Sequence, residues 1–154
     1  MDDLIFQKGI SEKQIDQLIN FSREDEVIKK NTNDPKRFKD RLSYDEWSKI
    51  PKHLYVLTNN KGGLLGLIWI RERKLDEDHT MTFGIRLYAK ARGKGLSESF
   101  LRRALEEYSK NNSSPKKFWL ETNPDNFTAI KLYEKFGFKK FGVNENGRII
   151  MIQS

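Results

Sequence analysis

The chain has 154 residues and no cysteine, with 36% hydrophobic and 33% charged residues. This length suits one domain whose core needs neither disulfides nor metal, and the lack of cysteine excludes a disulfide framework, a thiolate metal site and a cysteine nucleophile. The formal net charge of +7 favours anionic partners of any kind, nucleic acid included. Lysines and arginines are scattered among acidic residues, so a generally solvated surface explains the charge more simply.

Membrane and metal functions find little support in the sequence. The longest apolar run, residues 64–70, is too short to span a bilayer. The start Met1-Asp2-Asp3 differs from the basic start of a secretory leader, so we expect a cytoplasmic protein with no membrane partner. His53 and His79 lie far apart, and neither has a second ligand three or four residues away. Ordinary surface or hydrogen-bonded histidines are therefore favoured over metal ligands, and we expect no metal.

The first third of the chain predicts a strand followed by irregular helices. A short strand around Leu4 and Phe6 precedes a helix that begins with a capping box, in which Ser11 is followed three residues later by Gln14. Beyond this helix, charged and turn residues indicate only short elements. The expected elements are a loop at residues 31–35, a short helix at 35–42 and a helix that Ser43 caps and Pro51 ends.

The middle of the chain predicts three strands. Residues 54–58 and 64–70 are apolar and rich in β-formers, and the turn residues 59–63 between them indicate a hairpin. Further on, Met81, Phe83, Ile85 and Leu87 alternate with polar residues or glycine, the period-two pattern of a half-buried strand. These strands favour an antiparallel arrangement.

The last third predicts two helices, a strand and a hairpin. From Leu96 to Tyr108 the apolar residues fall on one helical stripe. After a loop at 111–117, residues 118–122 form a strand, and residues 123–126 begin a helix with Pro124 near its first turn. Gly137 is a natural stop for that helix. The segments 138–143 and 148–152 flank an Asn-Gly turn, a strong hairpin signal.

The turn between the third strand and the next helix has the composition of an anion site. Glycines at 93 and 95 let a ligand approach the backbone, and a helix N-terminus leaves amide hydrogens unpaired. Arg92 and Lys94 add charge-assisted bonds, so a pyrophosphate fits this turn. An ordinary basic turn explains an isolated Arg-Gly-Lys-Gly about equally well.

Two common phosphate loops do not fit this turn. A Walker loop needs glycine at position 88 and Ser or Thr at 95, where the chain has Tyr88 and Gly95. The dinucleotide fingerprint needs a third glycine where Glu98 stands, and the preceding strands indicate hairpins instead of a βαβ unit. Any anion is therefore bound in another way.

The order of elements is similar to that of the GNAT superfamily of acyl-CoA-dependent N-acetyltransferases, over nearly the whole chain. Residues 92–97 look like the family's pyrophosphate loop, with Ser97 in place of the usual last small residue. The spacing Asn126-x-x-Ala129-x-x-x-Tyr133-x-x-x-Gly137-Phe138 matches the family's later helix. The resemblance implies an α+β (mixed α/β) fold, with residues 1–154 as a single domain whose central, mostly antiparallel, splayed sheet is flanked by helices.

The resemblance also implies a site for acetyl-CoA. The backbone of two strand residues would pair with the pantetheine arm, the loop would hold the pyrophosphate, and Tyr133 would protonate the departing thiolate. Helix capping explains Asn126 equally well, and core packing is the simpler alternative for Tyr133. The cofactor-binding residues implied are Ile85, Leu87, Arg92, Gly93, Lys94, Gly95, Leu96, Ser97, Asn126 and Tyr133.

The amine's proton requires a base. An amine with a pKa of about 10.4, like that of lysine, is neutral only about once in 10³ to 10⁴ at pH 7. Many relatives use a carboxylate on the strand before the loop, but residues 79–83 contain none. Glu121 on the next strand is the nearest candidate, and a salt-bridged or solvent-facing Glu121 is an equally good explanation.

The resemblance thus favours an N-acetyltransferase that transfers acetyl from acetyl-CoA to a primary amine, on a small molecule or a peptide, by direct attack. A non-catalytic acyl-CoA-binding module is the alternative, since the usual carboxylate is missing. Nucleic-acid binding is less favoured because no recognised binding motif occurs. The sequence leaves open whether the protein forms a homodimer. Acceptor specificity is expected in residues 21–47 and the terminal hairpin.

Overall fold

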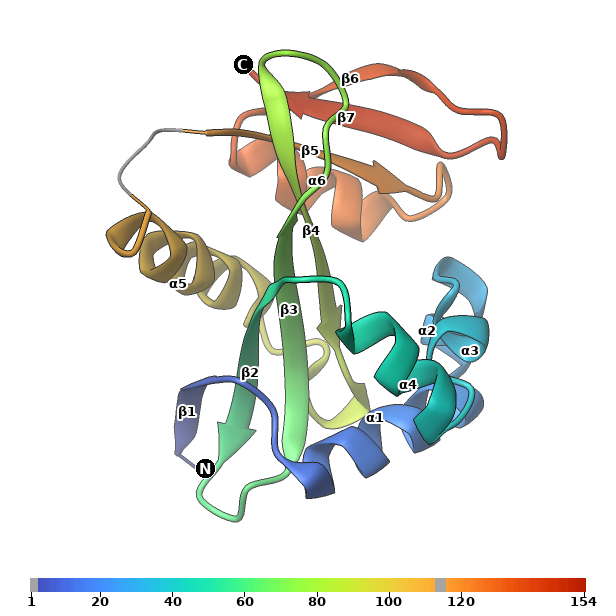
Figure 1. Ribbon diagram of the computed structural model, residues 1–154, viewed down its shortest axis with the longest axis vertical. Coiled ribbons are helices and arrows are strands. Elements are labelled where there is room, and N and C mark those ends of the chain that lie inside the picture. The colour runs from blue at the N-terminus through green and yellow to red at the C-terminus, as the bar shows by residue number, and fades with distance from the viewer. Residues whose placement is uncertain (1–2, 113–115) are drawn as a thin grey trace.

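The computed structural model describes residues 3–112 and 116–154. The described residues form a mixed α/β domain built on one seven-stranded sheet with strand order β1-β2-β3-β4-β5-β7-β6 (Figure 1). Adjacent strands run antiparallel except β4 and β5, which run parallel. The predicted α+β class with a mostly antiparallel sheet is confirmed.

The elements follow the predicted order, except that α2 and the 3-10 turn η1 are additional. The strands are β1 (Leu4–Lys8), β2 (His53–Asn59), β3 (Leu64–Glu72), β4 (His79–Leu87), β5 (Lys117–Thr122), β6 (Phe138–Val143) and β7 (Ile149–Gln153). The helices are α1 (Glu12–Glu24), α2 (Glu26–Asn31), α3 (Asp34–Arg37), α4 (Arg41–Ser48), the 3-10 turn η1 (Ala89–Ala91), α5 (Ser97–Lys110) and α6 (Phe127–Lys135). Positions 113–115 of the loop expected at 111–117 lie outside the described residues.

Helix starts are predicted correctly where the sequence offers a single N-cap candidate. The capping box of Ser11 and Gln14 forms as predicted. The start predicted at Ser43 is wrong, because the carboxylate of Asp40 accepts the Ser43 amide hydrogen at 2.9 Å and α4 already begins at Arg41. A carboxylate three residues upstream is as good a cap as a hydroxyl, and here it displaces the later candidate.

Two further helix limits differ from the prediction. The helix expected at residues 35–42 is shorter, since α3 ends at Arg37 and Phe38 is its C-cap. The last helix begins at Phe127 with Asn126 as its N-cap, so Pro124 lies in the turn before the helix and not in its first turn. Gly137 follows the C-cap of α6 with a φ of 85°, the left-handed conformation predicted for a helix stop.

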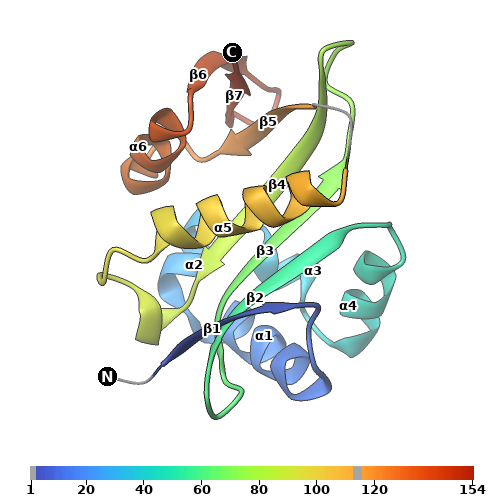
Figure 2. The same ribbon diagram turned by 90° about the vertical axis from the view of Figure 1, so that its left-hand side faces the viewer.

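The sheet carries a separate core on each face. Helices α1 to α4 cover one face, and α5 crosses the other (Figure 2). Alternation along β3 divides its side chains: Leu67 and Trp69 pack toward α1 to α4, while Ile68 and Ile70 pack toward α5. The sheet between them is therefore buried on both faces, which explains the continuous apolar run of β3.

Strands β4 and β5 separate part-way along the sheet. They pair only where His79, Met81 and Thr82 face residues 117–119. Beyond this, β4 continues paired with β3 alone, and β5 continues paired with β7 alone. Figure 1 shows β5 turning away from the long axis of β4. The sheet is therefore splayed, as the resemblance implied.

Candidate functional site

A cavity of about 490 Å³ lies where β4 and β5 separate, between the loop after η1 and helix α6. We call it the loop cavity. Apart from Lys94, which is exposed on the loop, every candidate site residue of the sequence analysis lines it. These residues are Ile85, Leu87, Arg92, Gly93, Gly95, Leu96, Ser97, Glu121, Asn126 and Tyr133.

The loop is shaped to expose backbone. Gly93 and Gly95 have φ values of 75° and 70°, a region that favours glycine. A Cβ added at either glycine would meet no atom within 4 Å, so space is open above both. Helix α5 starts with Leu96 as its N-cap, and no side chain caps it. The amide hydrogens of its first turn are therefore available to an anion.

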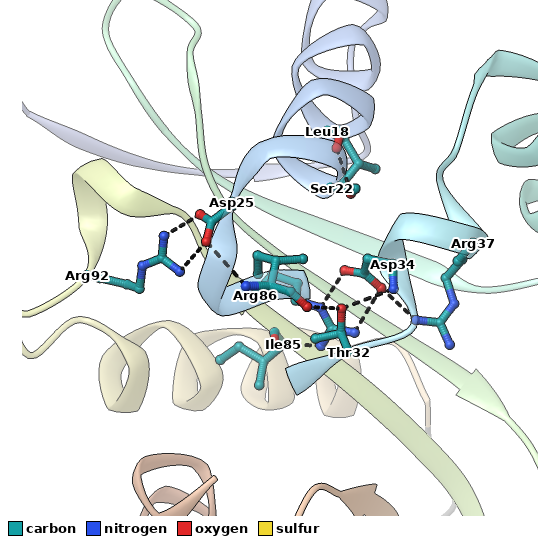
Figure 3. A network of polar contacts seen from close by, with 10 residues as sticks. Leu18, Ser22, Asp25, Thr32, Asp34, Arg37, Ile85, Arg86 and Arg92 are labelled. Atoms are coloured by element: carbon teal, nitrogen blue, oxygen red, sulfur yellow. Dashed lines mark hydrogen bonds and ion pairs between the residues drawn. The ribbon is translucent and has the colours of Figure 1, made fainter. Parts of the chain in front are cut away.

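Arg92 is held by an acidic residue from a distant segment. Its guanidinium forms a bidentate ion pair with Asp25, with Nη1 3.0 Å from Oδ1 and Nη2 bonded to Oδ2 (Figure 3). The same carboxylate caps α2 through the amides of Val27 and Ile28. Burial alone would raise the pKa of Asp25, but the bonds from Arg92 and from the α2 amides lower it. The loop and α2 are thus fastened together at the cavity.

A second ion-pair network holds β4 against α3. Asp34 is fully buried and receives Arg86 Nε at 2.6 Å on Oδ2 and Arg37 Nη1 at 2.7 Å on Oδ1 (Figure 3). Burial would raise the pKa of Asp34, but the two guanidinium groups hold it below its ordinary value. Arg86 lies between Ile85 and Leu87, which pack toward the opposite face of the sheet. This alternation leaves the two apolar residues facing the α5 side.

Tyr133 is a buried phenol that reaches the cavity. Its ring packs against Phe83 and Phe138, with centroids 5.8 Å and 6.2 Å away, and 7% of the residue is exposed. Burial raises the pKa of the hydroxyl, so the phenol keeps its proton at neutral pH. Within residues 3–112 and 116–154, no group hydrogen-bonds this hydroxyl. The core-packing and proton-donor interpretations therefore fit together.

Glu121 and Asn126 both make structural contacts as well as lining the cavity. The Glu121 carboxylate lies 3.6 Å from Arg73 Nη1 and 3.6 Å from Arg148 Nε. The side-chain oxygen of Asn126 accepts the Ala129 amide hydrogen at 3.3 Å and caps α6. The salt-bridge and capping alternatives thus describe real contacts, and neither removes the residue from the cavity wall.

A second cavity of about 610 Å³ adjoins the loop cavity. We call it the arginine cavity. Its walls come from the irregular helical segment, from β3 and β4, and from the β6–β7 hairpin. The helical segment and the hairpin are the two regions in which acceptor specificity was expected. The residues that line both cavities are Asn31, Thr32, Arg86, Glu121, Tyr133 and Arg148.

His79 serves structure. The ring nitrogens of His79 bond Asp76 Oδ1 at 2.9 Å and the Gln153 carbonyl at 2.8 Å, as predicted for an ordinary hydrogen-bonded histidine. Among residues 3–112 and 116–154, no group of three or more His, Cys, Asp or Glu side chains could hold a metal ion. In the same residues, no helix is both long enough and apolar enough to cross a membrane.

Comparison with known proteins decides the family. The sequence profile described as "Acetyltransferase (GNAT) family" matches residues 9–138. The chain belongs to the GNAT acetyltransferase family. It is therefore an acyltransferase, and the resemblance to this family is confirmed over residues 9–138. No curated protein sequence matches this GNAT chain.

Solved structures share the GNAT fold along nearly their whole length. A putative phosphinothricin N-acetyltransferase has a TM-score of 0.72 at 19% identity, covering 99% of this chain and 98% of that one. The spermidine N-acetyltransferase from Vibrio cholerae, solved with CoA and spermine, has a TM-score of 0.72 at 19% identity, with coverage of 97% and 92%. AAC(6')-Ib, solved with ribostamycin and coenzyme A, has a TM-score of 0.71 at 18% identity, with coverage of 99% and 94%.

Proposed function

We propose that this GNAT protein transfers acetyl from acetyl-CoA to a primary amine by direct attack. The donor lies in the loop cavity, and the amine enters from the arginine cavity. The observation that carries the proposal is that the two cavities meet at Tyr133 and Glu121. The structural neighbours solved with CoA support the choice of donor. The proposed setting is the cytoplasm, with a peptide or small-molecule amine as acceptor.

Each part of the loop cavity has a chemical counterpart in this donor. The first-turn amides of α5 and the side chains of Arg92 and Lys94 suit a pyrophosphate. On the side of β4 that faces the splay, Ile85 and Leu87 have no β5 partner, so their backbone groups can bond the amides of the pantetheine arm. Acetyl-CoA supplies an activated thioester at the end of that arm, near Tyr133.

The transfer forms a C–N bond, breaks a C–S bond and moves one proton, in net terms, from the amine to the sulfur. The neutral amine nitrogen attacks the thioester carbonyl, the C–N bond forms, and the C–S bond breaks with its electron pair on sulfur. Tyr133 gives its proton to the thiolate, and Glu121, directly or through water, takes the proton that the amine loses. Transfer of that proton from Glu121 to Tyr133 restores both residues to their starting states. Positioning the amine beside an activated thioester supplies much of the acceleration.

A non-catalytic acyl-CoA-binding module is the second candidate. One observation favours it: the carboxylate of Glu121, the proposed base, is already paired with Arg73 and Arg148. A CoA-release assay over amino acids, polyamines, aminoglycosides and peptide N-termini separates the two. Amine-dependent release supports the enzyme, whereas acetyl-CoA binding without release from any amine supports the module.

Replacing Arg92 and Lys94 together by Ala should weaken acetyl-CoA binding by about tenfold or more, because the pyrophosphate loses charge-assisted bonds while the backbone amides remain. Calorimetry measures the affinity. Arg92→Ala also releases Asp25, so Asp25→Asn is the matched control: the amide keeps an oxygen for the α2 cap and removes only the charge pair. Unchanged affinity in a folded double variant would place the donor's phosphates elsewhere.

Glu121→Gln should slow turnover mainly below the pKa of the acceptor amine, where removing a proton is demanding, and matter less as the pH rises. The measurement is a pH–rate profile. Glu106→Gln on the exposed face of α5 is the control and should leave the profile unchanged. An equal loss at every pH would assign Glu121 to binding or structure through its two arginine contacts instead of to proton removal.

A further inference from the structure

The arginine cavity is strongly positive. In the described part of the chain, six cationic side chains and one acidic side chain line it. The cations are Lys30, Arg37, Arg71, Arg73, Arg86 and Arg148, and the acid is Glu121. Behind the wall, Asp34 is already engaged by two of these cations, Arg86 and Arg37. Counting both acids against the six cations still leaves an excess of positive charge where the acceptor would enter.

Lys30 and Arg71 are the cations of this wall without an ion pair among the described residues, and Lys30 is exposed. Arg71 lies on β3, is partly buried, and has no hydrogen bond or ion pair to any group in residues 3–112 and 116–154. Burial, and next the charge of Arg73, lower the pKa of its guanidinium. A partly buried charge without a partner is unfavourable. An anion bound beside Arg71 would supply the missing partner.

Two of these cations are held in place by an aromatic ring. Trp47 and Trp69 meet edge to face with centroids 5.3 Å apart and belong to the apolar lining of the cavity. The guanidinium carbons of Arg86 and Arg37 lie 4.8 Å and 5.5 Å from the centroid of Trp69. Gly84 makes room for this ring, since a Cβ there would lie 2.3 Å from it. The positive wall is therefore preorganised before any ligand binds.

We propose that the acceptor is an amine that also carries an anionic group, a carboxylate or a phosphate, and that Arg71 binds that group. The inference rests on the acetyltransferase function proposed above and deepens it by naming the substrate class. With its anion at Arg71, the acceptor extends along the cavity so that its amine reaches the boundary formed by Tyr133 and Glu121. The same positive wall repels polycations such as polyamines.

The test uses amines that differ in one anionic group. The pairs are L-tryptophan with tryptamine, L-lysine with cadaverine, and phosphoethanolamine with ethanolamine, with spermidine as the polycation. In each accepted pair the anionic member should have a kcat/KM higher by about tenfold or more, because a charge-assisted bond is gained. The carboxylate and phosphate pairs distinguish the two sources of charge. Added salt should lower kcat/KM for the anionic member.

Arg71→Gln removes the charge and keeps a polar side chain of similar direction. It should lower kcat/KM for the anionic member by about 10- to 100-fold, mostly through KM, and leave the uncharged partner nearly unchanged. Arg71→Lys should restore part of the preference, because the positive charge returns without the planar fork. The control is Arg103→Gln on the exposed part of α5, which should change neither member. Thermal unfolding confirms that each variant is folded.

Two results would overturn the proposal: a wild-type preference for the uncharged or polycationic amine, or an equal loss for both members in Arg71→Gln. If no amine is acetylated, the transferase function fails, and the substrate class is then judged by binding alone. N-acetyl-L-tryptophan and N-acetyltryptamine are titrated into the protein in the presence of CoA. Binding of the first only, lost in Arg71→Gln, supports the anion site, and absence of that binding removes it.

Discussion

Tyr133→Phe should lower the rate of acetyl transfer by about 10²–10⁴-fold while acetyl-CoA binds almost as tightly as to the wild type. The substitution keeps the ring, which packs against Phe83 and Phe138, and removes only the hydroxyl. Because burial raises the pKa of this phenol, the wild-type residue holds a proton to give at neutral pH. The effect is smaller if expulsion of the thiolate, whose pKa is about 8.5, is not rate-limiting.

The structure also predicts little change in folding stability for this variant. Losing a hydroxyl that bonds a neighbour costs about 0.5–1.5 kcal/mol. Since no described group bonds the Tyr133 hydroxyl, that loss is not expected here. Tyr108→Phe is the matched control: Tyr108 is also a buried tyrosine, but its hydroxyl faces Met81 Sδ at 3.6 Å within the core.

Single-turnover kinetics, calorimetry with acetyl-CoA and thermal unfolding on both variants separate the outcomes. A rate loss in Tyr133→Phe alone, at unchanged affinity and stability, supports the proton donor. A stable Tyr133→Phe protein with wild-type turnover on its acceptor would end that assignment. A loss of similar size in Tyr108→Phe would show that packing, and not the missing proton, controls the rate.

Asp34→Asn should destabilise the protein by about 3–5 kcal/mol at pH 7. The amide has nearly the shape of the carboxylate but no charge, so Arg86 and Arg37 lose the anion that they share. Arg86 then stays largely buried as an unpaired cation between the sheet and α3, which is the expensive part of the change. Urea unfolding of wild type and variant at the same pH measures the free energy difference.

An exposed pair provides the control for this variant. Asp45 receives Arg41 Nε at 2.9 Å one turn away on α4, but half of its side chain is exposed. Surface pairs of this spacing contribute about 0.3–0.5 kcal/mol, so Asp45→Asn should have a small effect. Equal effects for the two variants would mean that the Asp34 network adds nothing beyond an ordinary surface contact.

The pH dependence of the Asp34 contribution follows from the direction of its shift. Its pKa in the folded protein is lower than the ordinary value of 3.8, so the stabilisation is fully present above that value. The stabilisation is lost as the pH falls through the lowered pKa of the folded state. The stability difference between wild type and Asp34→Asn should therefore be largest near neutral pH and shrink in strong acid. A difference that grows with acidity would contradict this assignment.

Local signals account for what the sequence predicted well. The capping box of Ser11 and Gln14, the glycine turn at 93–95 and the cap at Asn126 all bond or bend the chain within a few residues. Such features depend on the segment itself and survive whatever packs around it. The alternation along β4 worked for the same reason, since it sets which side chains share a face.

Contacts between distant segments could not be predicted from the sequence. The chain has 29 lysines and arginines and 22 acidic residues, so the partners of Arg92 and Arg86 could not be chosen from charge alone. Asp25 and Asp34 precede them by more than fifty residues and meet them only because α2 and α3 pack beside β4. The arginine cavity could not be predicted from the sequence for the same reason, since its cations come from separate helices, strands and the terminal hairpin.

The separation of β4 from β5 also creates two strand edges in the interior of a sheet. Exposed edges normally invite pairing with strands of other molecules, and proteins commonly blunt them with charges, proline or bulges. Here the edges face the loop cavity, whose other walls include α6 and the glycine loop. A slender extended molecule can enter and bond the open edge, whereas another protein's strand, with its own sheet behind it, is excluded. The unpaired edge is thus protected from aggregation by the same walls that keep it open to a ligand.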